Sequence, residues 1–299
     1  MKVFISKKPV SGPWGGGNKF VYKLIESLTE KNISITFDLT SDVDKIFCFD
    51  PRPNGQGLWF LDYLNHKKKF GTKIIQRVGD VGTHSKPELT TLVKQSTNIS
   101  DFIIFPSDWA RKTINHLKNN FKVINNAPLK IFHDNKKSEK NERRIKKIVT
   151  HHWSMNEKKG FDYYKFLGDK IFSGEIKDVE FTYIGRYNSK FASSGIKLLD
   201  PMNSVDLAKT LPLFDVYLTA SIEEAGANHV LEAMAVGLPI FYRNTDCSID
   251  EYCKNHGRKY NNKKNMIELL TSVDAKNYPV YEKTIDTVVN EYVELICKI

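Results

Sequence analysis

Short apolar runs alternate with longer stretches of helical periodicity along almost the whole chain. A short apolar run predicts a buried strand, whereas apolar residues spaced three and four positions apart predict an amphipathic helix. The predicted strands are residues 2–6, 33–38, 45–49, 73–78, 101–105, 121–125, 148–151, 180–184, 216–219 and 239–242. The predicted helices are residues 19–31, 58–64, 88–95, 107–117, 161–167, 204–211, 230–236, 263–270 and 281–299. This alternation is typical of parallel sheets covered by helices on both faces.

A polar and highly charged stretch, KKSEKNERRIKK at 136–147, interrupts the alternation. It holds too few apolar residues to pack, so we interpret it as an interdomain linker. The 299 residues of the chain are enough for two domains. We therefore predict an α/β protein with two Rossmann-like domains, residues 1–145 and 146–280, that face each other across a cleft. The ligand would lie in this cleft, beyond the carboxyl ends of the strands.

The net charge of +10 is distributed unevenly along the chain. Residues 1–145 hold 25 Lys and Arg against 14 Asp and Glu, whereas residues 146–299 hold 20 against 21. A basic half favours an anionic partner, such as a phosphorylated acceptor, an anionic membrane surface or nucleic acid. The alternative is a set of solvated lysines without a partner.

The sequence shows no apolar run of the roughly 18 residues that a membrane helix needs. The N-terminus has an apolar core of only three residues, which predicts a buried strand rather than a signal peptide. The four cysteines form no CxxC pair and read as free thiols of a reducing compartment. We therefore expect a cytoplasmic protein, with peripheral membrane contact through the basic domain as an alternative.

The segment 221–239 carries the most specific chemical signal. Small residues, including Gly226, lead from a predicted strand into a helix near Asn228. Backbone N–H groups and the positive end of a helix favour an anion there, and a nucleoside diphosphate fits this description. Glu224 lies in the loop ahead of the helix, where a carboxylate can accept hydrogen bonds from sugar hydroxyls, and Glu232 lies on the helix itself.

Glu224 and Glu232 are separated by seven residues and followed by Ala-Met-Ala-x-Gly-x-Pro. This pattern resembles the E-x7-E signature of retaining glycosyltransferases of the GT-B fold, family-four type. The resemblance implies that Glu224 contacts the transferred sugar and that Glu232 holds the ribose hydroxyls of a nucleoside diphosphate sugar. It also implies that the final helix, 281–299, packs on the N-terminal domain. One departure is Gly226-Ala227, which stands where the family usually has an aromatic residue and a glycine.

A second segment, 151–162, resembles the family's loop in which an Arg and a Lys-Gly pair clamp the diphosphate. Lys159 matches the lysine and is predicted to bind the donor and to stabilise the leaving group. Trp153 stands at the arginine position. Either that contact is missing, or Arg186 after the next strand or the neighbouring His152 replaces it. The alternative for His152 is a structural histidine.

A glycine run lies between the predicted first strand and first helix: Gly15, Gly16 and Gly17. Successive glycines permit close backbone approaches that side chains would block. The spacing matches neither the dinucleotide fingerprint nor a P-loop. In the resembled family this loop borders the donor phosphates and the acceptor, so the three glycines are candidate donor contacts. The alternative is a tight turn.

The end of the predicted strand 73–78 offers Arg77, Asp80 and His84. The resembled family often places a histidine here, near the reacting carbon. Asp80 and His84 are therefore candidate catalytic residues, and the alternative is that both lie in a loop outside the reaction.

These observations predict a glycosyltransferase of the hexosyltransferase type. It would transfer a sugar from a nucleoside diphosphate sugar to a hydroxyl group of a glycan, a lipid or a phosphorylated acceptor, with retention of configuration. No DxD-like pair follows a strand in the expected cleft, so we expect neither a metal nor another cofactor. The alternatives are a sugar-nucleotide epimerase or phosphorylase of similar fold, or a basic module that binds nucleic acid or membrane. Aromatic residues do not interleave with the basic ones, so nucleic acid is not expected.

Overall fold

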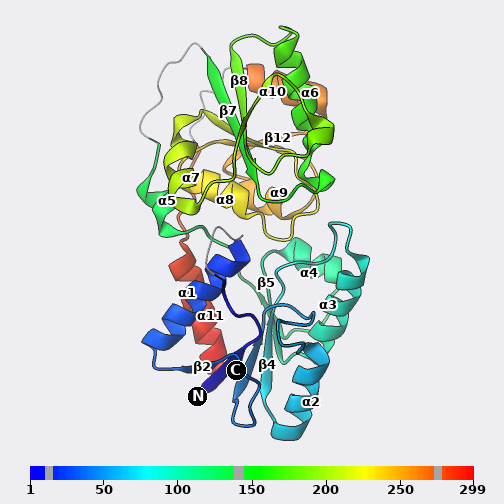
Figure 1. The fold of residues 1–299 in the computed structure, drawn as a ribbon, viewed down its shortest axis with the longest axis vertical. Coiled ribbons are helices and arrows are strands. Elements are labelled where there is room, and N and C mark those ends of the chain that lie inside the picture. The colour runs from blue at the N-terminus through cyan, green and yellow to red at the C-terminus, as the bar shows by residue number, and fades with distance from the viewer. Residues whose placement is uncertain (11–15, 138–144, 273–277) are drawn as a thin grey trace. The chain divides into compact units, whose positions relative to one another are not determined.

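The computed structural model describes residues 1–10, 16–137, 145–272 and 278–299. The chain divides into two compact units. Unit 1 comprises Met1–Asn126 and Ile285–Ile299, and unit 2 comprises Ala127–Thr284. Each unit contains a six-stranded parallel sheet with flanking helices (Figure 1), which confirms the predicted α/β class with two Rossmann-like units. The first change of unit falls at residue 126, earlier than the boundary expected at 145.

The sheet of unit 1 has the strand order β2-β1-β3-β4-β5-β6. Its strands are β1 (Lys2–Ile5), β2 (Ser34–Thr36), β3 (Lys45–Cys48), β4 (Lys73–Arg77), β5 (Phe102–Phe105) and β6 (Phe121–Val123). The order reverses between β1 and β3, because the chain moves from β1 to one side and later returns to the other. Such a reversal opens a crevice at the carboxyl ends of the strands, where ligands of α/β sheets bind.

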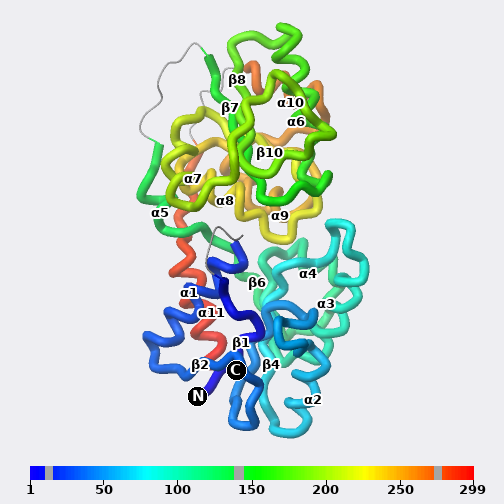
Figure 2. Tube along the Cα trace, in the orientation of Figure 1, coloured from blue at the N-terminus to red at the C-terminus, as the bar shows by residue number. Residues whose placement is uncertain are grey.

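Helices cover both faces of this sheet, as Figures 1 and 2 show. One face carries α1 (Gly16–Glu30) and α11 (Ile285–Lys298), and the other carries α2 (Phe60–Phe70), α3 (Pro87–Ile99) and α4 (Asp108–Ile114). Helix α11 packs on α1 through its apolar stripe, with the rings of Phe20 and Tyr292 4.8 Å apart at their centres. The hydroxyl group of Ser27 donates a hydrogen bond of 3.1 Å to Asn290. The C-terminal helix is therefore part of the core of unit 1.

The sheet of unit 2 has the order β12-β11-β10-β7-β8-β9. Its strands are β7 (Lys146–His152), β8 (Val179–Gly185), β9 (Ile196–Leu199), β10 (Val216–Thr219), β11 (Ile240–Arg243) and β12 (Gly257–Tyr260). Its helices are α5 (Lys130–Asp134), α6 (Phe161–Phe172), α7 (Ser204–Thr210), α8 (Asn228–Ala235), α9 (Ser248–Cys253) and α10 (Lys263–Thr271). The order reverses between β7 and β10, so the crevice of unit 2 lies at the carboxyl ends of these two strands.

Several predicted elements differ from the structure. The strands β9 and β12 were not predicted, because polar residues interrupt their apolar runs: Lys197 in β9, and Arg258 and Lys259 in β12. Helix α2 continues through the basic run at 66–69, whose lysines face the negative end of the helix dipole. The final helix begins at Ile285 instead of residue 281. Of the expected linker 136–147, residues 138–144 lie outside the described residues, and Lys146 and Lys147 are in β7.

The division into units also changes the charge distribution. Unit 1 holds 20 Lys and Arg against 14 Asp and Glu, a net charge of +6, and unit 2 holds 25 against 21, a net charge of +4. The excess is therefore shared by both units and is not a property of the first. No helix in the described residues is long and apolar enough to cross a membrane.

Candidate functional site

The residues of the predicted donor site meet in unit 2, at the carboxyl ends of β7 and β10. The loop after β7 contains a short 3₁₀ helix, Glu157–Lys159, and the loop after β10 leads into α8. The backbone of Ile222 donates a hydrogen bond of 2.8 Å to the carbonyl group of Lys158. Gly160 has a φ of 85°, and a Cβ atom there would lie 2.4 Å from Ala220 Cβ. Only glycine allows this approach, which brings Lys159 next to the loop before α8.

Two buried side-chain pairs occupy this position. Lys159 Nζ donates a hydrogen bond to Glu224 Oε1, with exposed side-chain fractions of 12% and 10%. His151 Nε2 lies 2.8 Å from Glu232 Oε2, with exposed fractions of 10% and 12%. Lys159 and Glu224 thus form one pair, and Glu232 belongs to the other. Because both carboxylates are nearly buried, each depends on its partner for stabilisation.

Tyr217 on β10 orients the ring of His151. Its hydroxyl oxygen lies 3.1 Å from His151 Nδ1, accepts a hydrogen bond from the backbone N–H of His151 and lies 3.2 Å from the His151 carbonyl oxygen. The hydroxyl group can donate to Nδ1 of a neutral ring, or accept from a protonated one while it donates to the carbonyl group. Burial raises the pKa of Tyr217 well above its usual value, so its proton stays available. In both of these arrangements Nε2 carries a hydrogen and faces Glu232 Oε2.

His229, the second residue of α8, lies between the two side-chain pairs. Its ring centre is 6.3 Å from that of His151, and its Nε2 lies 3.1 Å from Thr219 Oγ1. Burial lowers the pKa of His229 to about 3; the charge of Glu224 opposes this effect, and that of Lys159 adds to it. His229 is therefore neutral near pH 7.

The depressed pKa of His229 predicts a specific loss of stability in acid. The unfolded chain takes up a proton near pH 6.5 and the folded unit only near pH 3, so stability falls as the pH drops through this window. His229→Gln should lose less stability than the wild type between pH 7 and pH 4. Urea unfolding of both proteins at the two pH values measures the difference. Equal losses would show that His229 does not titrate in this way.

The neighbouring histidine, His152, also approaches His229, with its ring centre 4.7 Å from that of His229. It is 4% exposed, and its Nε2 lies 2.9 Å from the hydroxyl group of Tyr164 on α6. The contact of His152 with the donor stays a prediction. Gly185, at the end of β8, has a φ of 124°, and a Cβ atom there would lie 2.1 Å from the His152 carbonyl oxygen.

Arg186, the residue after β8, lies against the ring of Trp153, which stands where the resembled family has an arginine. Its guanidinium carbon is 4.1 Å from the centre of the Trp153 ring, and its backbone N–H donates a hydrogen bond of 3.3 Å to the carbonyl group of His152. Trp153 is 37% exposed. The loop after β8 therefore supplies a cation next to the loop after β7, and its contact with a diphosphate stays a prediction.

At the N-terminus of α8, Asn228 is the first helical residue, and its backbone N–H already donates a hydrogen bond of 3.0 Å to the carbonyl group of Gly226. Glu223, the neighbour of Glu224, pairs with Lys158, and these side chains are 36% and 31% exposed. Adjacent residues thus form one buried pair and one exposed pair, which offers a matched control for experiments.

The predicted residues of unit 1 do not gather around one feature. Gly16 and Gly17 form the first turn of α1, and Gly15 lies outside the described residues. Asp80 accepts hydrogen bonds from Gly82 N–H at 2.9 Å and from Lys86 at 2.8 Å. Burial would raise the pKa of Asp80, but these two partners outweigh it and lower the pKa.

Asp80 therefore holds a turn, and its catalytic role stays a prediction. His84 lies further along the same loop and is partly exposed.

No family model and no curated protein sequence matches this chain. Its structure is similar to the crystal structure of Anabaena HepE in complex with UDP and glucose, with a TM-score of 0.71, 11% identity and coverage of 100% of this chain and 99% of that chain. WaaG, a glycosyltransferase involved in lipopolysaccharide biosynthesis, has a TM-score of 0.61, 13% identity and coverage of 100% and 95%. The UDP-GlcNAc 2-epimerase from Methanocaldococcus jannaschii has a TM-score of 0.52, 15% identity and coverage of 96% and 84%.

The chain has the GT-B fold. In this GT-B chain the sequence-based analysis missed the contributions of Tyr217 and His229 and the pairing of His151 with Glu232. Two consecutive histidines at the end of a predicted strand were the available signal. His229 gave no such signal, since its neighbours are known only from the fold.

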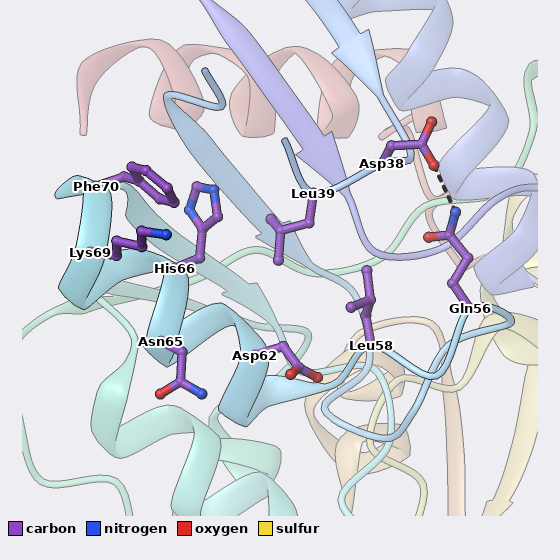
Figure 3. Close-up of a pocket in the computed structure, with 9 residues that line it drawn as sticks. All are labelled: Asp38, Leu39, Gln56, Leu58, Asp62, Asn65, His66, Lys69 and Phe70. Atoms are coloured by element: carbon purple, nitrogen blue, oxygen red, sulfur yellow. Dashed lines mark hydrogen bonds between the residues drawn. The ribbon is translucent and has the colours of Figure 1, made fainter. Parts of the chain in front are cut away.

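A cavity of about 480 Å³ lies in unit 1 of the GT-B chain, between α2 and the segment after β2 (Figure 3). Leu39 and Leu58 lie in the middle of its lining, and Asp38 and Gln56 join at one end through a hydrogen bond of 2.8 Å. His66 bonds to the Thr40 carbonyl group and to Thr72. The segment that connects β2 to β3 contains no helix, and the cavity lies beside it. The hydrogen bonds of Gln56 and His66 fix this segment in place.

Proposed function

We propose that this chain is a retaining glycosyltransferase that uses a nucleoside diphosphate sugar as its donor. The observation that carries the proposal is the meeting of Lys159, Glu224 and Glu232 at the crevice of unit 2, at the N-terminus of α8. The GT-B fold supports it, since ligands of such sheets bind at the carboxyl ends of the strands.

Each residue would have a distinct task in this reaction. Lys159 would neutralise negative charge on the leaving diphosphate, together with the N-terminal end of α8. Glu224 would hold a hydroxyl group of the transferred sugar, and Glu232 would accept hydrogen bonds from the ribose. The protein forms no covalent bond in this scheme, so positioning and charge stabilisation account for the acceleration.

In the structure Lys159 pairs with Glu224, so an incoming diphosphate must share the ammonium group with that carboxylate. The lysine has three donor hydrogens and can bridge the two anions. This sharing would place the sugar next to Glu224 when the phosphates bind Lys159. We therefore propose that the pair aligns the donor.

Arg186 is proposed as the second cation of the donor site, in place of the arginine that Trp153 replaces. Arg186→Gln should weaken the binding of the nucleoside diphosphate by about ten-fold or more, the usual loss when a hydrogen bond to a charged group is removed. Lys190→Gln is the matched control, because Lys190 lies on the next turn and pairs with exposed Glu157. Calorimetry that finds equal affinities for both variants would contradict this role.

The proposal extends to an acceptor hydroxyl group bound by unit 1, on a glycan, a lipid or a phosphorylated compound. It needs no metal, because the charge of the diphosphate would be met by Lys159, Arg186 and α8. A cytoplasmic location, with or without peripheral membrane contact, belongs to the same proposal.

An epimerase is the second candidate, because UDP-GlcNAc 2-epimerase shares the fold. A panel of UDP-, GDP- and ADP-sugars, followed by proton NMR, separates the two. A transferase releases nucleoside diphosphate at a rate that rises with acceptor, and its new glycosidic bond has the anomeric configuration of the donor. An altered sugar formed without acceptor would support the epimerase and contradict the transferase.

A further inference from the structure

Three neighbouring strands of unit 1 end next to one another at its crevice. Lys7 follows β1, Phe49 follows β3, and Arg77 is the last residue of β4. The backbone N–H of Phe49 donates a hydrogen bond of 2.8 Å to Ser6 Oγ, which joins the ends of β1 and β3. This is the point at which the strand order reverses, and ligands of α/β sheets bind at such points.

Arg77 is buried here without a carboxylate partner among the described residues. It is 5% exposed, and its guanidinium carbon lies 4.7 Å and 5.0 Å from the ring centres of Phe20 and Phe49. Its Nη2 donates a hydrogen bond of 3.1 Å to Asn126, and its Nε has no hydrogen-bond partner in the described part of the chain. Arginine is rarely buried without a counter-charge.

Lys7 adds a second cation on the same ring. Its Nζ lies 4.8 Å from the centre of Phe49 and forms no ion pair within the described ranges. Burial lowers the pKa of Lys7, and Arg77 and Arg52 lower it further, against the opposing charge of Asp50. Lys7 therefore lies close to the positive charges of Arg77 and Arg52, and Asp50 offsets them only in part.

The acidic residues nearby are already engaged. Asp50 accepts two hydrogen bonds from the guanidinium group of Arg52, at 2.9 Å and 2.5 Å, and one from its backbone N–H, and Asp80 pairs with Lys86. Residues 11–15 are Ser-Gly-Pro-Trp-Gly and contain no acid. Within unit 1, the positive charge at this crevice thus exceeds the negative charge.

We propose that this crevice binds a phosphate or carboxylate group carried by the acceptor. Lys7, which is partly exposed, would donate hydrogen bonds to the anion. Arg77 would act from behind the Phe49 ring as a fixed positive charge, without direct contact. This inference rests on the proposed function, since it assigns the anion to the acceptor and not to the donor.

The test compares three probes that differ in charge: glucose 6-phosphate, glucuronate and glucose. Calorimetry on the full chain should show at least one of the two anions binding about ten-fold or more tightly than glucose. Comparing glucose 6-phosphate with glucuronate shows whether the crevice binds a phosphate or a carboxylate group. Lys7→Gln should abolish the preference, and Lys7→Arg should retain it. Lys8→Gln is the control, because Lys8 lies on the ring of Phe37 instead.

The proposal is overturned if neither anion is preferred over glucose, or if Lys8→Gln and Lys7→Gln lose the preference equally. It is also overturned if Lys7→Gln weakens the binding of a free nucleoside diphosphate, because the anion would then belong to the donor. Nucleotide binding by the wild type tests the proposed function separately. A wild type that binds the nucleotide but prefers no anion would remove only this inference.

Discussion

Replacing Lys159 by Ala is expected to destabilise unit 2 by about 3 kcal/mol, the usual cost when one partner of a buried ion pair is removed. The variant leaves the Glu224 carboxylate, whose side chain is 10% exposed, without the ammonium group that neutralises it. For a unit of this size the loss corresponds to a decrease in melting temperature of roughly 6–12 °C. Scanning calorimetry without ligand measures this decrease.

The neighbouring pair provides the control for this experiment. Lys158→Ala opens an ion pair whose side chains are 31% and 36% exposed, so the cost should stay below about 1 kcal/mol. The double variant Lys159→Ala with Glu224→Gln should recover much of the loss, because no unpaired buried charge remains. Equal melting temperatures for the two lysine variants would show that the Lys159–Glu224 pair does not stabilise the unit.

Replacing Glu224 by Gln is expected to lower kcat by about 100-fold or more, the usual effect when charge stabilisation is lost in a transition state. The amide keeps the shape of the carboxylate but removes the charge that would face the sugar as its anomeric carbon becomes positive. Binding of the free nucleotide should change little, because Glu224 acts on the sugar. Initial rates at saturating donor, with calorimetry of the free nucleotide, separate the two quantities.

Glu223→Gln is the matched control for this prediction. Glu223 is exposed, paired with Lys158 and held in a left-handed conformation with a φ of 60°. Its variant should keep nearly full activity. If Glu223→Gln lost activity instead and Glu224→Gln kept it, the roles of the two adjacent glutamates would be exchanged.

The central elements of both sheets could be predicted because their strands are continuous apolar runs. The edge strands β9 and β12 could not, since solvent on one side allows Lys197, Arg258 and Lys259 within them. The large excess of positive charge in residues 1–145 arose because the domain boundary was placed at residue 145. The change of unit at residue 126 assigns Lys130, Lys136 and the basic run beyond them to unit 2.

Within the donor site, spacing alone predicted that Glu224 and Glu232 differ in position, and the helix α8 explains why. The partners of these carboxylates could not be predicted, because they depend on long-range contacts. His151 and Glu232 are far apart in the sequence, and the loop holding Lys159 reaches Glu224 only because Gly160 permits the approach to Ala220. The bonds of Asp80 to Gly82 and Lys86 could not be predicted from its position in the loop either.

The binding of free nucleoside diphosphates to Glu232→Gln tests the central claim most directly. The amide oxygen still accepts the hydrogen bond from His151 Nε2, so the fold is kept while the charge facing the ribose is lost. Calorimetry with UDP, GDP and ADP should find at least one that binds the wild type. That nucleotide should bind Glu232→Gln about ten-fold or more weakly, and Glu223→Gln as well as the wild type. If no nucleotide binds the wild type, or if Glu232→Gln binds it with unchanged affinity, the donor site is not where this account places it.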